Sequence, residues 1–133
     1  MKTIQIALAA LIMMFAVHTA SAQDKVVPLA VLLKGTSVVA QDVKNTFLGK
    51  IDNEFGNDSI LNEFSKYGNK FGADSIFNEF GKFGGKFSEF SPYNEFTNKP
   101  PMIVKEGKVI GYLTANKFMK GAISVPSLMS VMK

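Results

Sequence analysis

Three consecutive copies of a sixteen-residue unit, which together span residues 55–102, constrain this chain more than any other feature. They read FGNDSILNEFSKYGNK from Phe55, FGADSIFNEFGKFGGK from Phe71 and FSEFSPYNEFTNKPPM from Phe87. A unit this short cannot bury its own apolar side chains, so neighbouring units must pack on one another. The frequent glycines disfavour a helix, because each costs about 1 kcal/mol in a helix interior. We therefore expect a mainly β fold, a small repeat-built domain of short strands and turns.

Aromatic residues recur at fixed positions of the unit, and we predict that they stack between units as a repeat core. Asn residues recur beside them, and their amides can bond backbone at tight turns and stack on the Asn of the next unit. The predicted repeat core comprises Phe55, Phe64, Phe71, Phe77, Phe80, Phe87, Tyr93 and Phe96. The predicted Asn ladder comprises Asn62, Asn78 and Asn94.

The flanks of the array carry hairpin signals. Residues 23–54 are predicted to form a strand at 26–33, started or edged by Pro28, and a hairpin over 38–51. Residues 103–133 are predicted to form a second hairpin that turns at Glu106–Gly107, then a degenerate copy of the unit and a tail. The tail after Pro126 favours a short helix.

Residues 1–22 have the composition of a signal peptide. Lys2 precedes the apolar stretch 4–17, and Ala20-Ser21-Ala22 has the small-x-small pattern of a cleavage site. An uncleaved amino-terminal anchor is the alternative. We expect cleavage before Gln23, export to the periplasm or the exterior, and no stable membrane span in the single β-repeat domain 23–133.

The residue inventory after the leader disfavours most catalysis. His18 is the only His and lies in the leader, and the rest of the chain has no Cys, Trp or Arg. The usual general base at neutral pH and the usual thiol nucleophile are therefore absent. Lysines alternate with aromatic residues, as in Lys66-Tyr67, but Glu residues nearly cancel their charge, so we expect no nucleic-acid partner. We expect no cofactor, no metal site and no enzymatic activity.

Periodic carboxylates leave one alternative to this expectation. Glu63, Glu79 and Glu95 would serve a glycan hydrolase if two of them met across a cleft. Acidic and amide side chains such as Asp58 and Asp74 are also calcium ligand types, but the sequence lacks a calcium-loop motif, and turn capping explains them.

The order of these segments resembles a known family. The run DSIFNEFGKFGGKFSEFSPYNEF followed by PPMIVKEGKVIGYLTANKF is similar to the bacterial four-fold β-flower proteins, over about residues 47–118. The resemblance implies a small, mainly β, repeat-built exported domain of unknown function, and it brings no catalytic or binding residues. This chain departs from the family in its many Lys and Glu residues.

The sequence thus predicts a non-enzymatic exported module of the cell envelope, structural or binding, with an unknown envelope protein or glycan as partner. The alternatives are the envelope glycan hydrolase and a surface protein that self-associates, for example through exposed strand edges.

Overall fold

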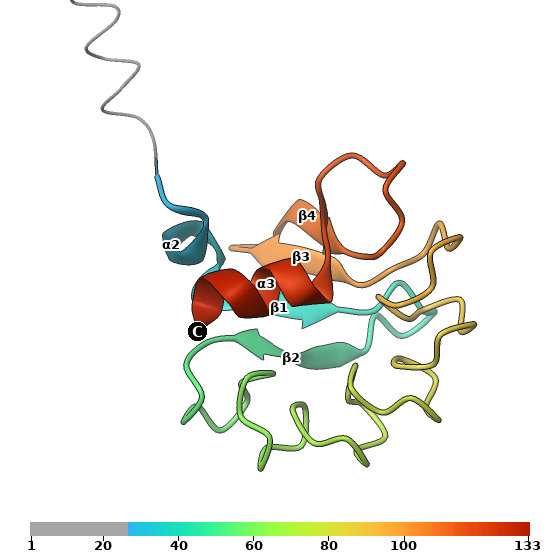
Figure 1. The fold of residues 1–133 in the computed structure, drawn as a ribbon, viewed down its shortest axis with the longest axis horizontal. Helices are drawn as coiled ribbons and strands as arrows, with labels where there is room; N and C mark the ends of the chain where they lie inside the picture. The colour runs from blue at the N-terminus through green and yellow to red at the C-terminus, as the bar shows by residue number, and fades with distance from the viewer. Residues whose placement is uncertain (1–26) are drawn as a thin grey trace, which may run out of the picture. The chain divides into compact units, whose positions relative to one another are not determined.

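The computed structural model describes residues 27–133 (Figure 1). The chain divides into two units, residues 1–32 and residues 33–133. The second unit contains the sheet and the C-terminal helix. The predicted leader, residues 1–22, lies outside the described residues.

The apolar run at residues 26–33 is helical where it is described, so the strand predicted there is wrong. Helix α2 (Leu29–Leu33) begins after Pro28, whose carbonyl accepts hydrogen bonds from the backbone N–H groups of Val31 and Leu32. Leu and Ala are strong helix formers, and proline is tolerated at a helix start because the first N–H groups have no intrahelical partner.

A five-stranded mixed sheet forms the centre of the unit 33–133, with strand order β2-β1-β3-β4-β5. All neighbours pair antiparallel except β4 and β5, which are parallel. The described part of the chain is therefore mainly β. The strands are β1 (Thr36–Val39), β2 (Phe47–Ile51), β3 (Met102–Lys105), β4 (Lys108–Leu113) and β5 (Ala122–Ile123).

Both predicted hairpins are confirmed. β1 pairs with β2 across a loop in which Asn45 has a positive φ of 50° and donates its N–H to Asp42 O. β3 pairs with β4 across Glu106 and Gly107, which have φ values of 50° and 78°. Two consecutive positive φ values suit the right-handed twist of a two-residue hairpin.

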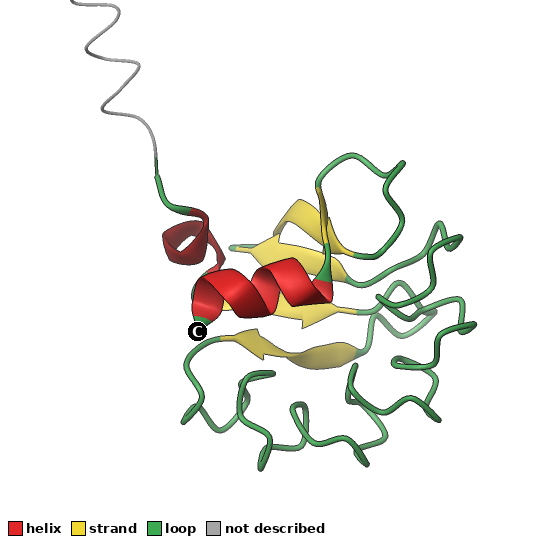
Figure 2. Cartoon of the chain, in the orientation of Figure 1, coloured by secondary structure: helices red, strands yellow, loops and turns green. Residues whose placement is uncertain are grey.

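The array between β2 and β3 contains turns rather than the short strands predicted for it (Figure 2). Corner residues of the array donate their backbone N–H to a carbonyl three residues back. The exceptions are two four-residue steps, from Ser65 to Asn69 and from Gly81 to Gly85. Small polar residues and glycines stand at the corners, where their side chains or their freedom favour turns. These corners are Asn53, Gly56, Ser59, Asn62, Ser65, Asn69, Gly72, Ser75, Asn78, Gly81, Gly85, Ser88, Ser91, Asn94 and Thr97.

Side chains at the corners hold successive coils of the array together. Asn62 Nδ2 donates to Gly56 O at 2.9 Å, Ser65 Oγ to Ser59 O at 2.7 Å, and Ser75 Oγ to Tyr67 O at 3.0 Å. Each bond reaches back six to eight residues, which is one coil. Side-chain donors thus link neighbouring coils, whereas backbone N–H groups link neighbouring strands in a sheet.

The array meets the sheet along the outer edge of β2. Lys50 donates its backbone N–H to Asp58 O at 2.7 Å and accepts from Ile60 N at 2.9 Å. The other edge strand, β5, has only two residues. It pairs only with Tyr112 and Leu113, so no strand within residues 27–133 covers the edge of β4 before Tyr112 on that side.

Aliphatic side chains dominate the core. The C-terminal helix predicted after Pro126 is confirmed as α3 (Val125–Met132), which is capped by Ser124 and buries Val125 and Leu128. No helix within residues 27–133 is long and apolar enough to cross a bilayer. The buried hydrophobic cluster consists of Leu33, Val38, Ala40, Leu48, Ile51, Ile60, Leu61, Ile76, Phe83, Ile103, Leu113, Val125 and Leu128.

Candidate functional site

Seven phenylalanines stand on the surface at the tips of seven similar turns. Their side chains are 81% to 99% exposed. Each turn has a corner residue, then Glu or Lys, then Phe, and the residue after Phe donates its N–H to the carbonyl of the corner residue. We call these residues the Phe ladder: Phe55, Phe64, Phe71, Phe80, Phe87, Phe96 and Phe118.

Asparagine fixes the shape of six of these turns. Its Oδ1 accepts a hydrogen bond from the backbone N–H of the Phe two residues later, at 2.8 to 3.1 Å. The remaining turn, the fifth along the chain, has Gly85 at its corner. This hydrogen bond from the backbone to the Asn side chain fixes the backbone at each Phe, although the phenyl ring itself is in solvent.

The seven turns follow one another in a continuous stack. Asn78 Nδ2 donates to Gly72 O and Asn94 Nδ2 to Ser88 O, both at 3.0 Å. Ser88 Oγ donates to Lys82 O, which joins the turn at Gly85 to the turn before it. The turns at Asn62 and Asn69 meet by close approach, because a Cβ on Gly72 would lie 2.5 Å from Lys66 O.

The last turn joins the stack from a distant part of the sequence. Asn116 Nδ2 donates to Thr97 O at 3.0 Å, in the same way as Asn94 donates to Ser88 O. The hairpin of β3 and β4 is therefore inserted between the sixth and seventh turns. The turns therefore form one series that curves around the sheet (Figure 1), and residues at equivalent turn positions follow one another along that curve.

The predicted repeat core is wrong for six of its eight members. Phe55, Phe64, Phe71, Phe80, Phe87 and Phe96 are exposed, because the third position of a tight turn points away from the coil. Phe77 and Tyr93 do pack against the core. The buried positions of the units are instead Ile60, Ile76 and Pro92, which lie sixteen residues apart.

The Asn ladder is also corrected. The side chains of Asn62, Asn78 and Asn94 bond backbone at both ends: Oδ1 accepts from the turn's own Phe and Nδ2 donates to the preceding coil. The predicted bonds to backbone at tight turns are thus confirmed, but the bonds that link coils run to backbone carbonyls and not to the Asn of the next unit. The recurrence of Asn-Glu-Phe and Asn-Lys-Phe, also at residues 53, 69 and 116, is the sequence signal for six of the seven turns, and the turn at Gly85 reads Gly-Lys-Phe.

The second positions of the seven turns carry charge. We call them the charge ladder: Glu54, Glu63, Lys70, Glu79, Lys86, Glu95 and Lys117. From the second turn to the seventh, the sign alternates strictly along the stack. The ladder therefore presents no uniform field to a polyanion or a polycation.

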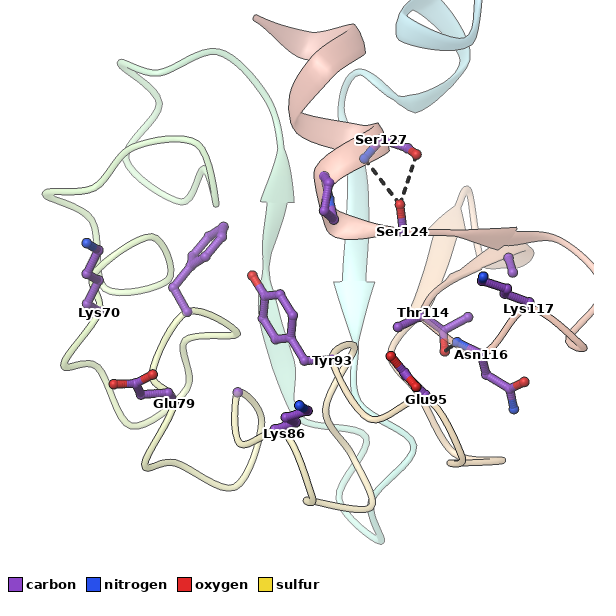
Figure 3. A pocket seen from close by; sticks show the side chains of 15 residues that line it. Lys70, Glu79, Lys86, Tyr93, Glu95, Thr114, Asn116, Lys117, Ser124 and Ser127 are labelled. Atoms are coloured by element: carbon purple, nitrogen blue, oxygen red, sulfur yellow. Dashed lines mark hydrogen bonds between the residues drawn. The ribbon is translucent and has the colours of Figure 1, made fainter.

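A groove of about 990 Å³ lies beside the charge ladder (Figure 3). Five ladder residues line it, from Lys70 to Lys117, together with Phe77, Tyr93 and the first residues of α3. Burial raises the pKa of Tyr93, so its phenol stays protonated at neutral pH and can donate a hydrogen bond. None of the Phe ladder lines this groove, so the two ladders face different sides of the stack.

The carboxylates considered for hydrolysis are not gathered at one point. Glu79 and Glu95 line the same groove, whereas Glu63 lines a smaller one of about 450 Å³. Lys86 and Tyr93 lie between Glu79 and Glu95 in Figure 3. A hydrolase needs two carboxyl groups across one scissile bond, and the turn that carries Lys86 separates these two.

One ion pair, in which the carboxylate is buried and the Lys side chain is 55% exposed, ties the array to the first hairpin. Lys82 Nζ lies 3.3 Å from Asp42 Oδ2, and the Asp42 side chain is 3% exposed. Burial by itself raises the pKa of Asp42, but hydrogen bonds from the Thr46 side chain and backbone, and the Lys82 charge, outweigh it and hold the pKa below its ordinary value. This carboxylate is fully paired, which marks it as structural.

Within residues 27–133, no three His, Cys, Asp or Glu side chains lie close enough together to hold a metal ion. Comparisons with family models, with curated proteins and with solved structures find no match to the chain.

Proposed function

We propose that this chain is an exported, non-enzymatic module of the cell envelope and that it binds its partner through the Phe ladder. The observation that carries the proposal is the exposure of all seven rings at 81% or more. An aromatic side chain has roughly 150 to 250 Å² of surface to bury, so the ladder offers on the order of 1,000 Å². Among the described residues the only aromatic ring pair is Phe47–Tyr67, so the ladder rings do not stack on one another and each offers a separate contact.

The fixed turns support binding rather than disorder at this surface. Each ring is carried by a backbone that Asn or a coil-to-coil hydrogen bond holds in place. Prior ordering lowers the entropy that binding must offset. Export belongs to the same proposal, because it follows from the signal-like composition of residues 1–22.

Repeat architecture and membership of the four-fold β-flower family are the structural part of this proposal. The shared corner residues at sixteen-residue spacing, such as Ser59, Ser75 and Ser91, support it. Equivalent positions then have equivalent tasks, namely buried aliphatics inside and phenylalanines at the tips.

Replacement of ladder rings tests the proposal. The triple variant Phe64→Ser, Phe80→Ser and Phe96→Ser is compared with wild type for sedimentation with envelope fragments of the producing cell. Binding is expected to weaken at least about tenfold, because each buried aromatic contributes roughly 1.5 to 3 kcal/mol. Val43→Ser is the control, since Val43 is fully exposed but lies outside the ladder. Unchanged sedimentation of the triple variant, with a wild-type circular dichroism spectrum, would refute the proposal.

A glycan hydrolase is the second candidate, and the shared groove of Glu79 and Glu95 is the observation that favours it. Incubation of the chain with purified envelope glycan and an assay for released reducing ends decides between the two. We expect no release by wild type. Release that is lost in both Glu79→Gln and Glu95→Gln would replace the binding proposal with the enzymatic one.

A further inference from the structure

We propose that the groove of about 990 Å³ between the array and the first residues of α3 binds a neutral oligosaccharide without cleaving it. None of the Phe ladder lines this groove, so the site goes beyond the proposed function. Its basis is an amphipathic pattern that repeats along the groove, with aromatic rings on the floor and charged side chains at the rim.

Large and small residues alternate along the groove floor. The floor consists of the residues that stand directly before the corners of consecutive turns, namely Phe77, Gly84, Tyr93 and Ala115. Phe77 and Tyr93 are half-buried, so part of each ring is open to the groove. Coil packing requires the glycine between them, because a Cβ on Gly84 would lie 2.2 Å from Asn78 O. The floor therefore offers two apolar surfaces with a notch between them.

The charged rim follows the same repeat. Glu79 stands two residues after Phe77, and Glu95 stands two residues after Tyr93. Lys86 lies on the turn between them. These rim charges take part in none of the ion pairs formed within residues 27–133, which are Lys66–Asp74, Lys82–Asp42 and Lys99–Glu89. The rim therefore has carboxylates that can accept hydrogen bonds from a ligand and ammonium groups that can donate them.

The Tyr93 hydroxyl has no hydrogen-bond partner within the part of the chain that the structure describes. The hydrogen bond that Tyr93 does make there is donated by its backbone N–H, to Ser91 Oγ at 3.1 Å. Burial is the sole cause that raises the pKa of Tyr93, and the phenol is protonated at neutral pH. It can therefore donate one hydrogen bond to a ligand and accept another. The hydroxyls of Thr114, Ser124 and Ser127 also line the groove (Figure 3).

A sugar ring matches this pattern of floor and rim. One face of a pyranose presents C–H groups, which pack on aromatic rings, and its edge carries hydroxyls, which donate and accept hydrogen bonds. Phe77 with Glu79, and Tyr93 with Glu95, are two copies of one apolar-and-carboxylate pair, so a chain of similar sugar units can meet both. Opposite charges alternate at the rim, which favours a neutral chain over an anionic one.

A peptide fits the groove less well. Peptides are recognised by a free strand edge or by grooves with apolar pockets for anchor side chains. Ala122 of the two-residue β5 is the single strand residue among those that line the groove, and two residues are too few to pair with a peptide strand. Cleavage of a glycan is also disfavoured, because the turn that carries Lys86 separates Glu79 from Glu95.

Titration with soluble glycans tests the site. The probes are cellohexaose, chitohexaose and maltohexaose, which are neutral hexasaccharides. They are added to isotope-labelled full chain, as recovered from expressing cells, and binding is followed by NMR. At least one probe is expected to bind with a dissociation constant of about 1 mM or below. It should shift the backbone amide signals of Gly84 and Tyr93 and leave that of Phe64 unchanged.

Substitutions on the floor and on the rim locate the binding. Tyr93→Ala should weaken it at least about tenfold, because a floor ring and its hydroxyl are lost. Tyr67→Ala is the matched control, since Tyr67 is also half-buried against the core but does not line the groove. Lys86→Ala should weaken binding at least about threefold. Its control is Lys108→Ala on the β3–β4 hairpin, and both lysines are exposed, so neither change should unfold the chain.

Circular dichroism of each variant checks that the fold persists. The glycan site is overturned if wild type binds none of the hexasaccharides, if Tyr67→Ala and Tyr93→Ala lose binding equally, or if Lys86→Ala binds as wild type does. Tighter binding of hexagalacturonate or of a peptide of alternating Glu and Lys would also overturn it. Cleavage of a bound hexasaccharide would replace it with the hydrolase.

The outcomes separate the glycan site from the proposed function. The triple Phe-ladder variant should bind the hexasaccharide as wild type does. Envelope sedimentation that depends on the Phe ladder, in a chain that binds no hexasaccharide, overturns only the glycan site. Hexasaccharide binding in a chain whose sedimentation ignores the Phe ladder overturns only the use of the ladder.

Discussion

The Nδ2 of Asn116 donates to Thr97 O at 3.0 Å across nineteen residues of sequence. This bond places the turn after β4 on the array that ends before β3. It converts six tandem turns and one distant turn into a single stack, and it sets the position of Phe118 and Lys117 on the two ladders.

Loss of this bond should loosen the last rung. Asn116 is 7% exposed, so Asn116→Ala leaves the buried carbonyl of Thr97 and the partly buried N–H of Phe118 without their partner. We expect a loss of about 1 to 3 kcal/mol in the free energy of unfolding, measured by urea titration. Asn98→Ala serves as control, because Asn98 is exposed and should change stability by less than about 0.5 kcal/mol. Equal losses in both variants would contradict the stacking of the seventh turn.

Adjacent glycines should differ sharply in their tolerance of alanine. A Cβ on Gly84 would lie 2.2 Å from Asn78 O, whereas a Cβ on Gly85 would lie 3.2 Å from its nearest neighbour. Backbone of the neighbouring coil blocks Gly84, so Gly84→Ala must force the coils apart. We expect a loss of more than about 3 kcal/mol for Gly84→Ala and about 1 kcal/mol or less for Gly85→Ala. Thermal unfolding of the two variants measures the difference, and similar melting temperatures would show that the coils are not in contact there.

Within one sixteen-residue unit, removing the side chain of Ile76 should destabilise the fold far more than removing the phenyl ring of Phe80. A core made of the repeated phenylalanines would predict the reverse. Ile76 is fully buried and Phe80 is 91% exposed. Ile76→Ala should cost about 2 to 5 kcal/mol because it leaves a cavity. Phe80→Ala should lower the free energy of unfolding by less than about 0.5 kcal/mol when it is measured on dilute protein, where the chain does not associate. If denaturant titrations gave a larger loss for Phe80→Ala than for Ile76→Ala, the core would be made by the phenylalanines.

The stability of the chain should depend on pH through Asp42. The pKa of Asp42 is lower in the folded state, so its contribution is present above the unfolded pKa of about 3.9 and is lost as pH falls through the folded value. Asp42→Asn should therefore cost about 1.5 to 3 kcal/mol at pH 7, with the gap to wild type closing below about pH 4. Glu89→Gln is the control, because the Glu89–Lys99 pair is about half exposed on both sides and should contribute at most about 1 kcal/mol. If the difference in unfolding free energy between wild type and Asp42→Asn stayed constant from pH 7 to pH 2, the ionised Asp42 would not be the source of the stability.

Local signals in the sequence predicted the parts of the fold that depend on local chemistry. Glu106–Gly107 predicted its hairpin because a two-residue turn needs positive φ values, and Pro126 predicted the start of α3. The strand predicted at residues 26–33 was wrong, because neither the length nor the composition of this apolar run separates a buried strand from a short helix.

The site was only half predictable. Sixteen-residue periodicity correctly grouped Phe64, Phe80 and Phe96 as equivalent, but equivalence does not say whether a position faces the core or the solvent. The Asn two residues before each Phe is the informative neighbour, since it bonds the backbone N–H of the Phe and fixes the turn that carries the ring outward.

The sequence by itself determined which residues share an environment, where the chain must turn, and that residues 23–133 contain no His or Cys for catalysis. Only the tertiary structure decided that Ile60 and Ile76 face the core while the seven residues of the Phe ladder face outward, and that Lys117 follows Glu95 on the charge ladder. The physical reason is that a coil of turns has an inner and an outer side. Which side is buried depends on where β2 and the core residues of α3 meet the coil, and those contacts join residues far apart in the sequence.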